Sequence, residues 1–132
     1  MMYTMKNVCD KLNITYETLR FYCNEGLVPN VKRDQHNYRV FDDRDLNWLL
    51  SLQCLRSCGF SIKEMKEYMN LCLDGPSSII TRKKILAEKR EKLQREMEDI
   101  QGSIDFIDHK QEFYDGVLEG KIRYTSNLIP VD

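Results

Sequence analysis

A sevenfold repeat in the last part of the sequence restricts the fold more than any other feature. Apolar or aromatic residues recur at every seventh position: Ile79, Leu86, Leu93, Ile100, Ile107 and Tyr114. This heptad spacing is typical of a long helix that pairs with another helix in a coiled coil. With these residues at d, the a positions hold Lys83, Arg90, Met97, Ile104 and Gln111. We predict a dimerisation helix over residues 78–116, with the interface residues Ile79, Leu86, Leu93, Met97, Ile100, Ile104 and Ile107.

Charge is divided along this predicted helix. Residues 82–95 carry seven basic and two acidic side chains, whereas residues 96–119 carry one basic and eight acidic side chains. A parallel pair would set like charges against each other, but an antiparallel pair sets each basic half against an acidic half. We therefore predict an antiparallel homodimer with two-fold symmetry. The alternative is a long helix that folds back on its own domain.

Two short helices separated by a tight turn are predicted at the start of the chain. Thr4 and Thr15 are suitable N-cap residues, and apolar residues follow each of them at helical spacing. The second helix runs from Tyr16 to Glu25, and Gly26 suits the left-handed position after it. This order is the helix-turn-helix pattern. The second helix turns Leu19, Tyr22 and Cys23 inward and leaves Tyr16, Glu17, Arg20 and part of Thr18 outward.

A basic β-hairpin follows. Two short runs typical of strands, residues 31–33 and 38–41, flank a polar turn in which Asn37 suits a left-handed conformation. The hairpin carries Lys32, Arg33 and Arg39 against a single acidic residue, Asp34. Its local charge is therefore positive.

Two more helices are predicted before the heptad repeat. The first begins at Asp42 or Asp43, and the second begins with a capping box of Ser61 and Glu64 and breaks at Gly75. Apolar residues on two sides indicate that the first of these helices is buried between neighbours. Its two stripes are Leu46, Leu49 and Leu50, and Trp48, Leu52 and Leu55. The second helix is expected to turn Ile62, Met65, Met69 and Leu73 inward.

Composition excludes several classes of protein. The 132 residues are 42% hydrophobic and 31% charged, which suits one helix-rich domain with an extension but not a large enzyme. No apolar run is long enough for a membrane span, and the first residues lack the pattern of a signal peptide, so we expect a cytoplasmic protein. The fold class expected is mainly α, with a helix-turn-helix and hairpin domain at residues 1–75, the coiled coil at 78–116 and a short tail at 117–132.

The five cysteines form neither an obvious disulfide framework nor a metal site. Their number is odd, no C-x-x-C pair occurs, and His36 and His109 lie far from them in sequence. We expect free thiols, no metal and no cofactor. Paired carboxylates, a phosphate-binding loop or a nucleophile with a base are also missing from the sequence, so no enzymatic activity is predicted.

The order of these parts, together with several short motifs, resembles the MerR family of bacterial transcription regulators. Those motifs are Tyr3-Thr4, Thr18-Leu19-Arg20-Phe21-Tyr22, Glu25-Gly26-Leu27, Asn37-Tyr38-Arg39 and Gly59-Phe60-Ser61. The resemblance implies a winged helix-turn-helix in which the helix from Tyr16 enters the major groove of double-stranded promoter DNA and the hairpin contacts the backbone. The DNA-binding residues implied are Thr15, Tyr16, Glu17, Thr18, Arg20, Tyr22, Lys32, Arg33, Tyr38 and Arg39. Glu17, in place of a basic residue, and Asn37, in place of a glycine, depart from the family pattern.

The resemblance also implies a mode of action. Dimers of the family bend and untwist promoter DNA so that RNA polymerase can engage both promoter elements. The segment Gln53-Cys54-Leu55-Arg56 is similar to the small thiol- and aldehyde-responsive (AdhR/NmlR-like) branch, which makes Cys54 a candidate sensor. Two alternatives stay open: Cys54 is a structural cysteine, or the chain is a coiled-coil adaptor that binds protein and senses nothing. Tyr22 likewise has an alternative interpretation, as a core aromatic residue.

Overall fold

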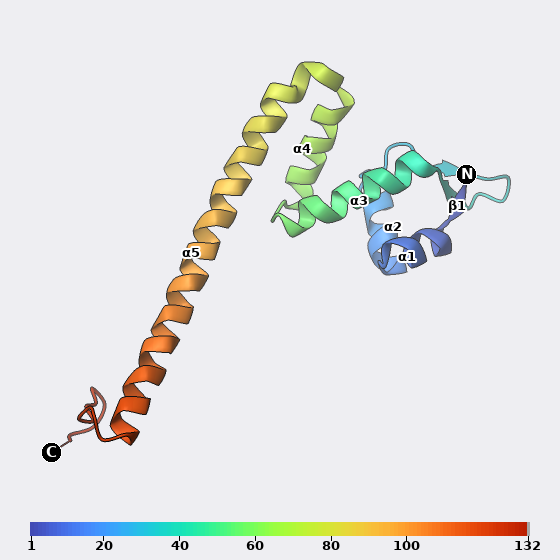
Figure 1. Ribbon diagram of the computed structural model, residues 1–132. Coiled ribbons are helices and arrows are strands. Elements are labelled where there is room, and N and C mark those ends of the chain that lie inside the picture. The colour runs from blue at the N-terminus through green and yellow to red at the C-terminus, as the bar shows by residue number, and fades with distance from the viewer. Residues whose placement is uncertain (132) are drawn as a thin grey trace. The chain divides into compact units, whose positions relative to one another are not determined.

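The computed structural model describes residues 1–131 and divides the chain into two compact units, of which the first is Met1–Lys89 and the second begins at Arg90. The described residues are mainly helical, with one small sheet (Figure 1). The elements are β1 (Tyr3–Thr4), α1 (Met5–Leu12), α2 (Tyr16–Asn24), β2 (Lys32–Arg33), β3 (Arg39–Phe41), α3 (Asp43–Ser57), α4 (Ile62–Leu73), a 3-10 turn (Gly75–Ser78) and α5 (Ile79–Leu118).

The predicted helix-turn-helix is confirmed in α1 and α2. The hydroxyl oxygen of Thr4 accepts a hydrogen bond from the backbone N–H of Asn7 at 3.1 Å, and that of Thr15 accepts one from the N–H of Thr18 at 3.1 Å. These bonds satisfy N–H groups that have no partner inside their helices. Asn13 takes a left-handed conformation (φ 52°) at the end of α1, and this allows the sharp turn into α2.

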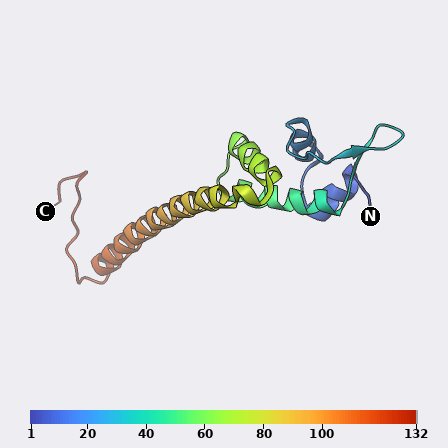
Figure 2. The same cartoon turned by 90° about the horizontal axis from the view of Figure 1, so that it is seen from above.

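The hairpin forms the wing, residues 31–41, and the sheet has one strand more than the sequence predicted. β3 pairs antiparallel with β2 on one side and with β1 on the other, in the order β1-β3-β2. Asn37 at the turn has φ 65°, as expected. Figure 2 shows the loop between β2 and β3 projecting beside the N-terminus. β1 has only two residues, too few to show the alternation that reveals a strand.

Helix α3 is buried against several neighbours. Its N-cap is Asp42, which exchanges reciprocal bonds with Asp45. The expected burial of α3 is confirmed for Leu49 and Leu52, both 0% exposed, but is wrong for Leu50, which is 46% exposed. Neighbours cover α3 on part of its circumference only, so an apolar residue outside that arc remains at the surface. The buried core contains Val8, Leu19, Tyr22, Leu27, Val28, Phe41, Leu49, Leu52, Leu55, Phe60 and Met65.

Helix α4 begins where the sequence predicted, but its last residue is exposed and not buried as expected. Ser61 and Glu64 form the capping box, with bonds of 3.0 and 3.1 Å. Leu73, predicted to lie inward, is 60% exposed. It is the last residue of α4, and the chain turns away at Gly75 (φ 76°), so it has no further helix to pack against.

The first turns of α5 belong to the first compact unit, which ends at Lys89. Ile85 packs against the core. The ammonium of Lys89 lies 2.7 Å from a carboxylate oxygen of Glu64 and 5.0 Å from the centre of the Phe60 ring. That ammonium, together with the N–H of Ser61, lowers the pKa of Glu64 to about 2. An ion pair and apolar packing thus both tie the start of α5 to α4.

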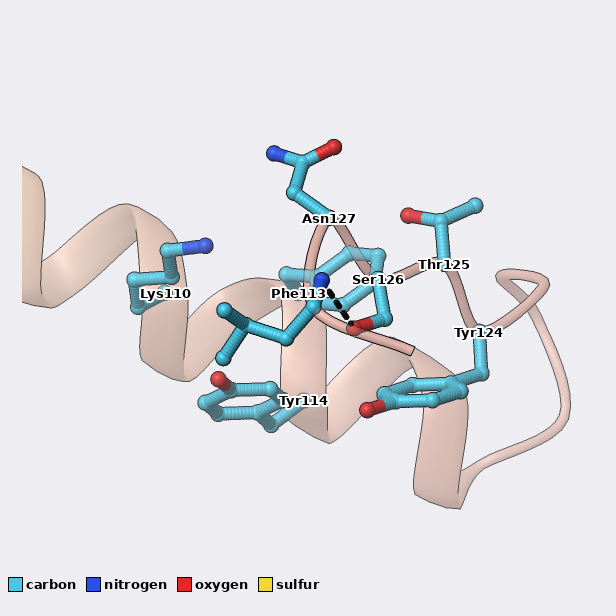
Figure 3. Close-up of a pocket in the computed structure, with 8 residues that line it drawn as sticks. Lys110, Phe113, Tyr114, Tyr124, Thr125, Ser126 and Asn127 are labelled. Atoms are coloured by element: carbon cyan, nitrogen blue, oxygen red, sulfur yellow. Dashed lines mark hydrogen bonds between the residues drawn. The ribbon is translucent and has the colours of Figure 1, made fainter. Parts of the chain in front are cut away.

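The tail after α5 folds back on the end of that helix (Figure 3). The N–H groups of Lys121 and Ile122 donate to the carbonyl of Gly116 at 2.9 and 3.1 Å, and the rings of Phe113 and Tyr124 lie 6.5 Å apart. A hollow of about 460 Å³ lies between the helix and the tail. Gly116 is buried because the side chain of Ile122 lies over it. Among the described residues, no helix combines the length and the apolar character needed to cross a bilayer.

Two glycines of α5 provide a matched test of this tail packing. An added Cβ at Gly116 would lie 2.8 Å from Cγ1 of Ile122, whereas one at Gly102 meets no atom within 4 Å. We expect Gly102→Ala to raise the free energy of unfolding by about 1 kcal/mol, because alanine is the better helix former. Gly116→Ala should instead displace Ile122 and speed tryptic cleavage after Lys121 and Arg123. Equal cleavage rates in the two variants would contradict the packing described.

Candidate nucleic-acid interface

The outward face of α2 carries several of the side chains that the family resemblance implies to contact DNA. Tyr16, Glu17 and Arg20 are exposed, and none of them makes a side-chain hydrogen bond or ion pair within residues 1–131. Thr15 differs, because its hydroxyl caps α2 and donates to the hydroxyl of Thr18 at 2.9 Å. The free polar groups on this face are therefore those of Tyr16, Glu17 and Arg20, and a hydroxyl, a carboxylate and a guanidinium can all reach base edges or phosphates.

Tyr22 combines the two interpretations left open by the sequence. Its ring is 2% exposed and lies in the core, which confirms the interpretation as a core aromatic residue. Its hydroxyl has no hydrogen-bond partner in residues 1–131, yet no fully buried side-chain oxygen or nitrogen in this range lacks a partner. The hydroxyl therefore reaches solvent, in a hollow that Glu17 and Thr18 also line. A phosphate contact by Tyr22 would involve only this oxygen.

The three cations of the wing differ in how far their N–H donors are already used in bonds within the protein. The ammonium of Lys32 lies 3.0 Å from a carboxylate oxygen of Asp42, and this contact, after the stronger effect of the Asp45 N–H, lowers the pKa of Asp42 to about 2. Arg33 donates to the carbonyl of Asn37 at 2.8 Å, and Arg39 donates to the side chain of Asn24 at 2.7 Å. A guanidinium has five N–H donors, so both arginines keep donors for a ligand. Lys32 is the cation most occupied by the fold.

Tyr38, next to Arg39 in sequence, is 70% exposed on the wing and is therefore accessible to a ligand. Two residues, Phe21 of α2 and Arg56 of α3, were not assigned a role from the sequence. Phe21 is 44% exposed, and Arg56 lines the same hollow as Tyr22 and Glu17. Arg56 belongs to α3 and lines this hollow because α2 and α3 pack in the same core, so no local motif indicates it.

The five cysteines are free thiols in the structure. Cys54 is the exposed one, and it lines a hollow of about 390 Å³ together with Cys72, Trp48 and Tyr68. Cys72 was not singled out from the sequence; its sulfur lies 3.8 Å from a guanidinium nitrogen of Arg82. Burial raises the pKa of the Cys9 and Cys23 thiols, which makes them poorer nucleophiles.

Within residues 1–131 no group of three or more His, Cys, Asp or Glu side chains could hold a metal ion.

A short helix pair, a basic wing and an exposed polar helix face define a winged helix-turn-helix, the class of domain that DNA-binding regulators use. Comparison with protein families agrees. The model of the MerR HTH family regulatory proteins matches residues 3–72, and a second model, described as MerR, DNA binding, matches residues 46–110. The chain belongs to the MerR family of helix-turn-helix transcriptional regulators, a DNA-binding class and not an enzyme class. The predicted fold class and family are confirmed.

Relatives place the chain near the predicted branch. An HTH-type transcriptional regulator of Haemophilus influenzae is 35% identical over 86% of this chain and 84% of its own length. The regulator AdhR of Bacillus subtilis is 37% identical over 65% of this chain, which spans 61% of AdhR. The crystal structure of HiNmlR, a MerR family regulator lacking the sensor domain and bound to promoter DNA, superposes with a TM-score of 0.74 and 34% identity over 90% of this chain and 94% of that one. The resemblance to the AdhR/NmlR-like branch is confirmed.

Proposed function

We propose that the protein is a homodimeric regulator that binds double-stranded promoter DNA, distorts it, and responds to electrophiles through Cys54. The observation that carries DNA binding is the free polar face of α2 beside the wing. Helices in this position of a winged helix-turn-helix enter the major groove, and wing cations and hydroxyls bind phosphates. Tyr16, Glu17 and Arg20 would contact bases and backbone in the groove, and Arg33, Tyr38 and Arg39 would contact the flanking strand. The promoter-bound structure of HiNmlR, which matches nearly the whole chain, supports this mode.

Homodimerisation is supported by an apolar stripe that has no covering in the single chain. Leu86 is 42% exposed, Ile100 60% and Ile107 56%, although all three are apolar d residues of the heptad repeat. Exposed apolar residues at several d positions of one helix are typical of a helix that pairs with another. The basic half at residues 82–95 and the acidic half at residues 96–119 favour an antiparallel partner of the same sequence.

Distortion of DNA follows from the presence of two DNA-binding domains on one dimer. A dimer that binds two half-sites can offset the cost of bending and untwisting the duplex between them, which is of the order of 1–6 kcal/mol for a smooth bend. The functional consequence is a change in the relative setting of the two promoter elements that RNA polymerase must contact. A regulator of promoters acts where the chromosome lies, which in bacteria is the cytoplasm.

Cys54 is proposed as the sensor because its thiol is exposed in a hollow next to helices of the core. A thiol adds to an aldehyde when its sulfur bonds to the carbonyl carbon and its proton moves to the carbonyl oxygen, so the step needs no oxidant. The adduct adds volume and a hydroxyl group between Trp48, Leu55 and Tyr68, residues of α3 and α4. Since α3 also packs against the wing and α2 through the core, an adduct there is placed to alter the setting of the DNA-binding elements.

An adaptor that binds protein through its coiled coil is the second candidate. The same exposed stripe on α5 favours it, because that stripe accepts any helix of matching pattern. Specific binding to duplex DNA distinguishes the two functions, because an adaptor of this kind would not select a DNA sequence.

Replacing Arg20 tests the DNA-binding face. The wild-type protein should select specific duplexes from a random pool, and Arg20→Ala should bind the selected duplex more weakly. The slope of log K against log salt concentration should fall by about 0.9, since one phosphate contact is lost. Arg95→Ala, at the outward f position of the heptad repeat, removes the same charge and should leave both quantities unchanged. Failure of the wild-type protein to select any sequence would favour the adaptor.

Replacing one d residue tests the dimer. We expect sedimentation equilibrium to give twice the chain mass for the wild-type protein and the chain mass for Ile100→Glu, because a carboxylate in the seam must be desolvated. His109→Glu, which adds the same group at an f position, should stay dimeric. A wild-type monomer at micromolar concentration would contradict the homodimer.

Replacing Cys54 tests the sensor, with Cys72 as the matched control from the same hollow. In vitro transcription from a promoter that carries the selected duplex should respond to formaldehyde with the wild-type protein and with Cys72→Ser, but not with Cys54→Ser. Intact-mass measurement should show the adduct on the two responsive proteins. A normal formaldehyde response from Cys54→Ser would show that Cys54 is structural.

A further inference from the structure

A hollow lined by basic side chains lies between the wing and the first turn of α1, and no motif of the sequence indicates it. Its volume is about 420 Å³, and Tyr16 of α2 lies at its border. We call it the basic hollow. Three cations line it, Lys6, Arg33 and Arg39, against one carboxylate, that of Asp34. One oxygen of that carboxylate already accepts the N–H groups of His36 and Tyr38, at 2.8 and 3.0 Å, so the hollow has a surplus of donors.

Lys6 is the cation of this hollow that the fold does not use. Its side chain is exposed, and within residues 1–131 its ammonium makes no hydrogen bond and no ion pair. Arg33 and Arg39, by comparison, each donate one bond to a neighbouring segment of the first unit. Lys6 also lies in the first turn of α1, which contains no acidic residue and where the helix dipole disfavours a positive charge. Neither stability nor local pairing explains a lysine at this position.

We propose that the basic hollow holds one phosphate of the DNA backbone and that Lys6 is a further phosphate-contacting residue. The proposal rests on the DNA binding proposed above. The hollow is bordered by Tyr16 of α2 and by Tyr38 of the wing, the two elements assigned to the groove and to the flanking strand. A backbone that runs from one element to the other passes the hollow. The ammonium of Lys6 and the remaining N–H donors of Arg33 and Arg39 match the oxygens of a phosphate, which bind such donors through charge-assisted bonds.

The test compares Lys6→Ala with Lys92→Ala, an exposed lysine at a c position of the heptad repeat. Each is titrated with the selected duplex and with a random duplex over a series of KCl concentrations. Lys6→Ala should bind both duplexes about five- to tenfold more weakly, and the slope of log K against log salt concentration should fall by about 0.9, since a lost phosphate contact acts on all sequences alike. Lys92→Ala should match the wild-type protein, and Lys6→Arg should restore both affinity and slope.

The outcomes separate this proposal from the one on which it rests. If the wild-type protein binds DNA but Lys6→Ala retains its affinity or its salt slope, the assignment of Lys6 is overturned while DNA binding stands. If the wild-type protein binds no duplex, the proposed function itself fails. Inorganic phosphate, titrated alone and followed by amide chemical shifts, tests the other source of this anion. Saturable binding of free phosphate at the hollow, with an unchanged salt slope for Lys6→Ala, would assign the hollow to a free anion and overturn the contact with DNA.

Discussion

The burial of one face of α3 is the interaction on which the rest of the first unit depends. Leu49 and Leu52 are fully buried in the same core as Leu19 of α2, Leu27 after α2 and Phe41 of β3. Each fully buried leucine contributes about 1.5–3 kcal/mol. The indole N–H of Trp48 helps to orient α3 relative to the segment after α2, because it donates a hydrogen bond to the carbonyl of Leu27 at 2.6 Å. Helix α2 and the wing are thus both held in place by α3.

The same helix also packs against α4. Arg56 of α3 lies beside α2, whereas Cys54 of α3 opens into the hollow shared with α4. The start of α5 is held to α4 by the Lys89–Glu64 ion pair and to the 3-10 turn by Arg82, whose guanidinium donates to the carbonyl of Gly75 at 2.6 Å. Under the proposed function, a change in volume at Cys54 would act on a helix that packs against both β3 of the wing and α4. These contacts support the proposal that Cys54 is the sensor.

Predictions from sequence held where a pattern is local. The N-caps Thr4, Thr15 and Ser61 were predicted because their side chains bond to N–H groups two or three residues ahead, and no distant contact is needed. Predictions were wrong at Leu50 and Leu73, where apolar character alone was used to infer burial. An apolar residue is buried only if another element covers it, and helical spacing does not say how wide that cover is. The assigned DNA contacts remain predictions, although the structure leaves Tyr16, Glu17 and Arg20 free to make them.

The sequence by itself determined the order and type of the helices, the hairpin and the heptad repeat, because periodicity, capping and charge distribution are properties of neighbouring residues. Only the tertiary structure decided which side chains share a surface. It added β1 to the sheet, buried the ring of Tyr22 while leaving its hydroxyl at the surface, and placed Cys72 in the hollow of Cys54. It also brought Lys6 to the wing. These relations join residues far apart in the chain, and they follow from the way the helices pack around α3, which no local pattern records.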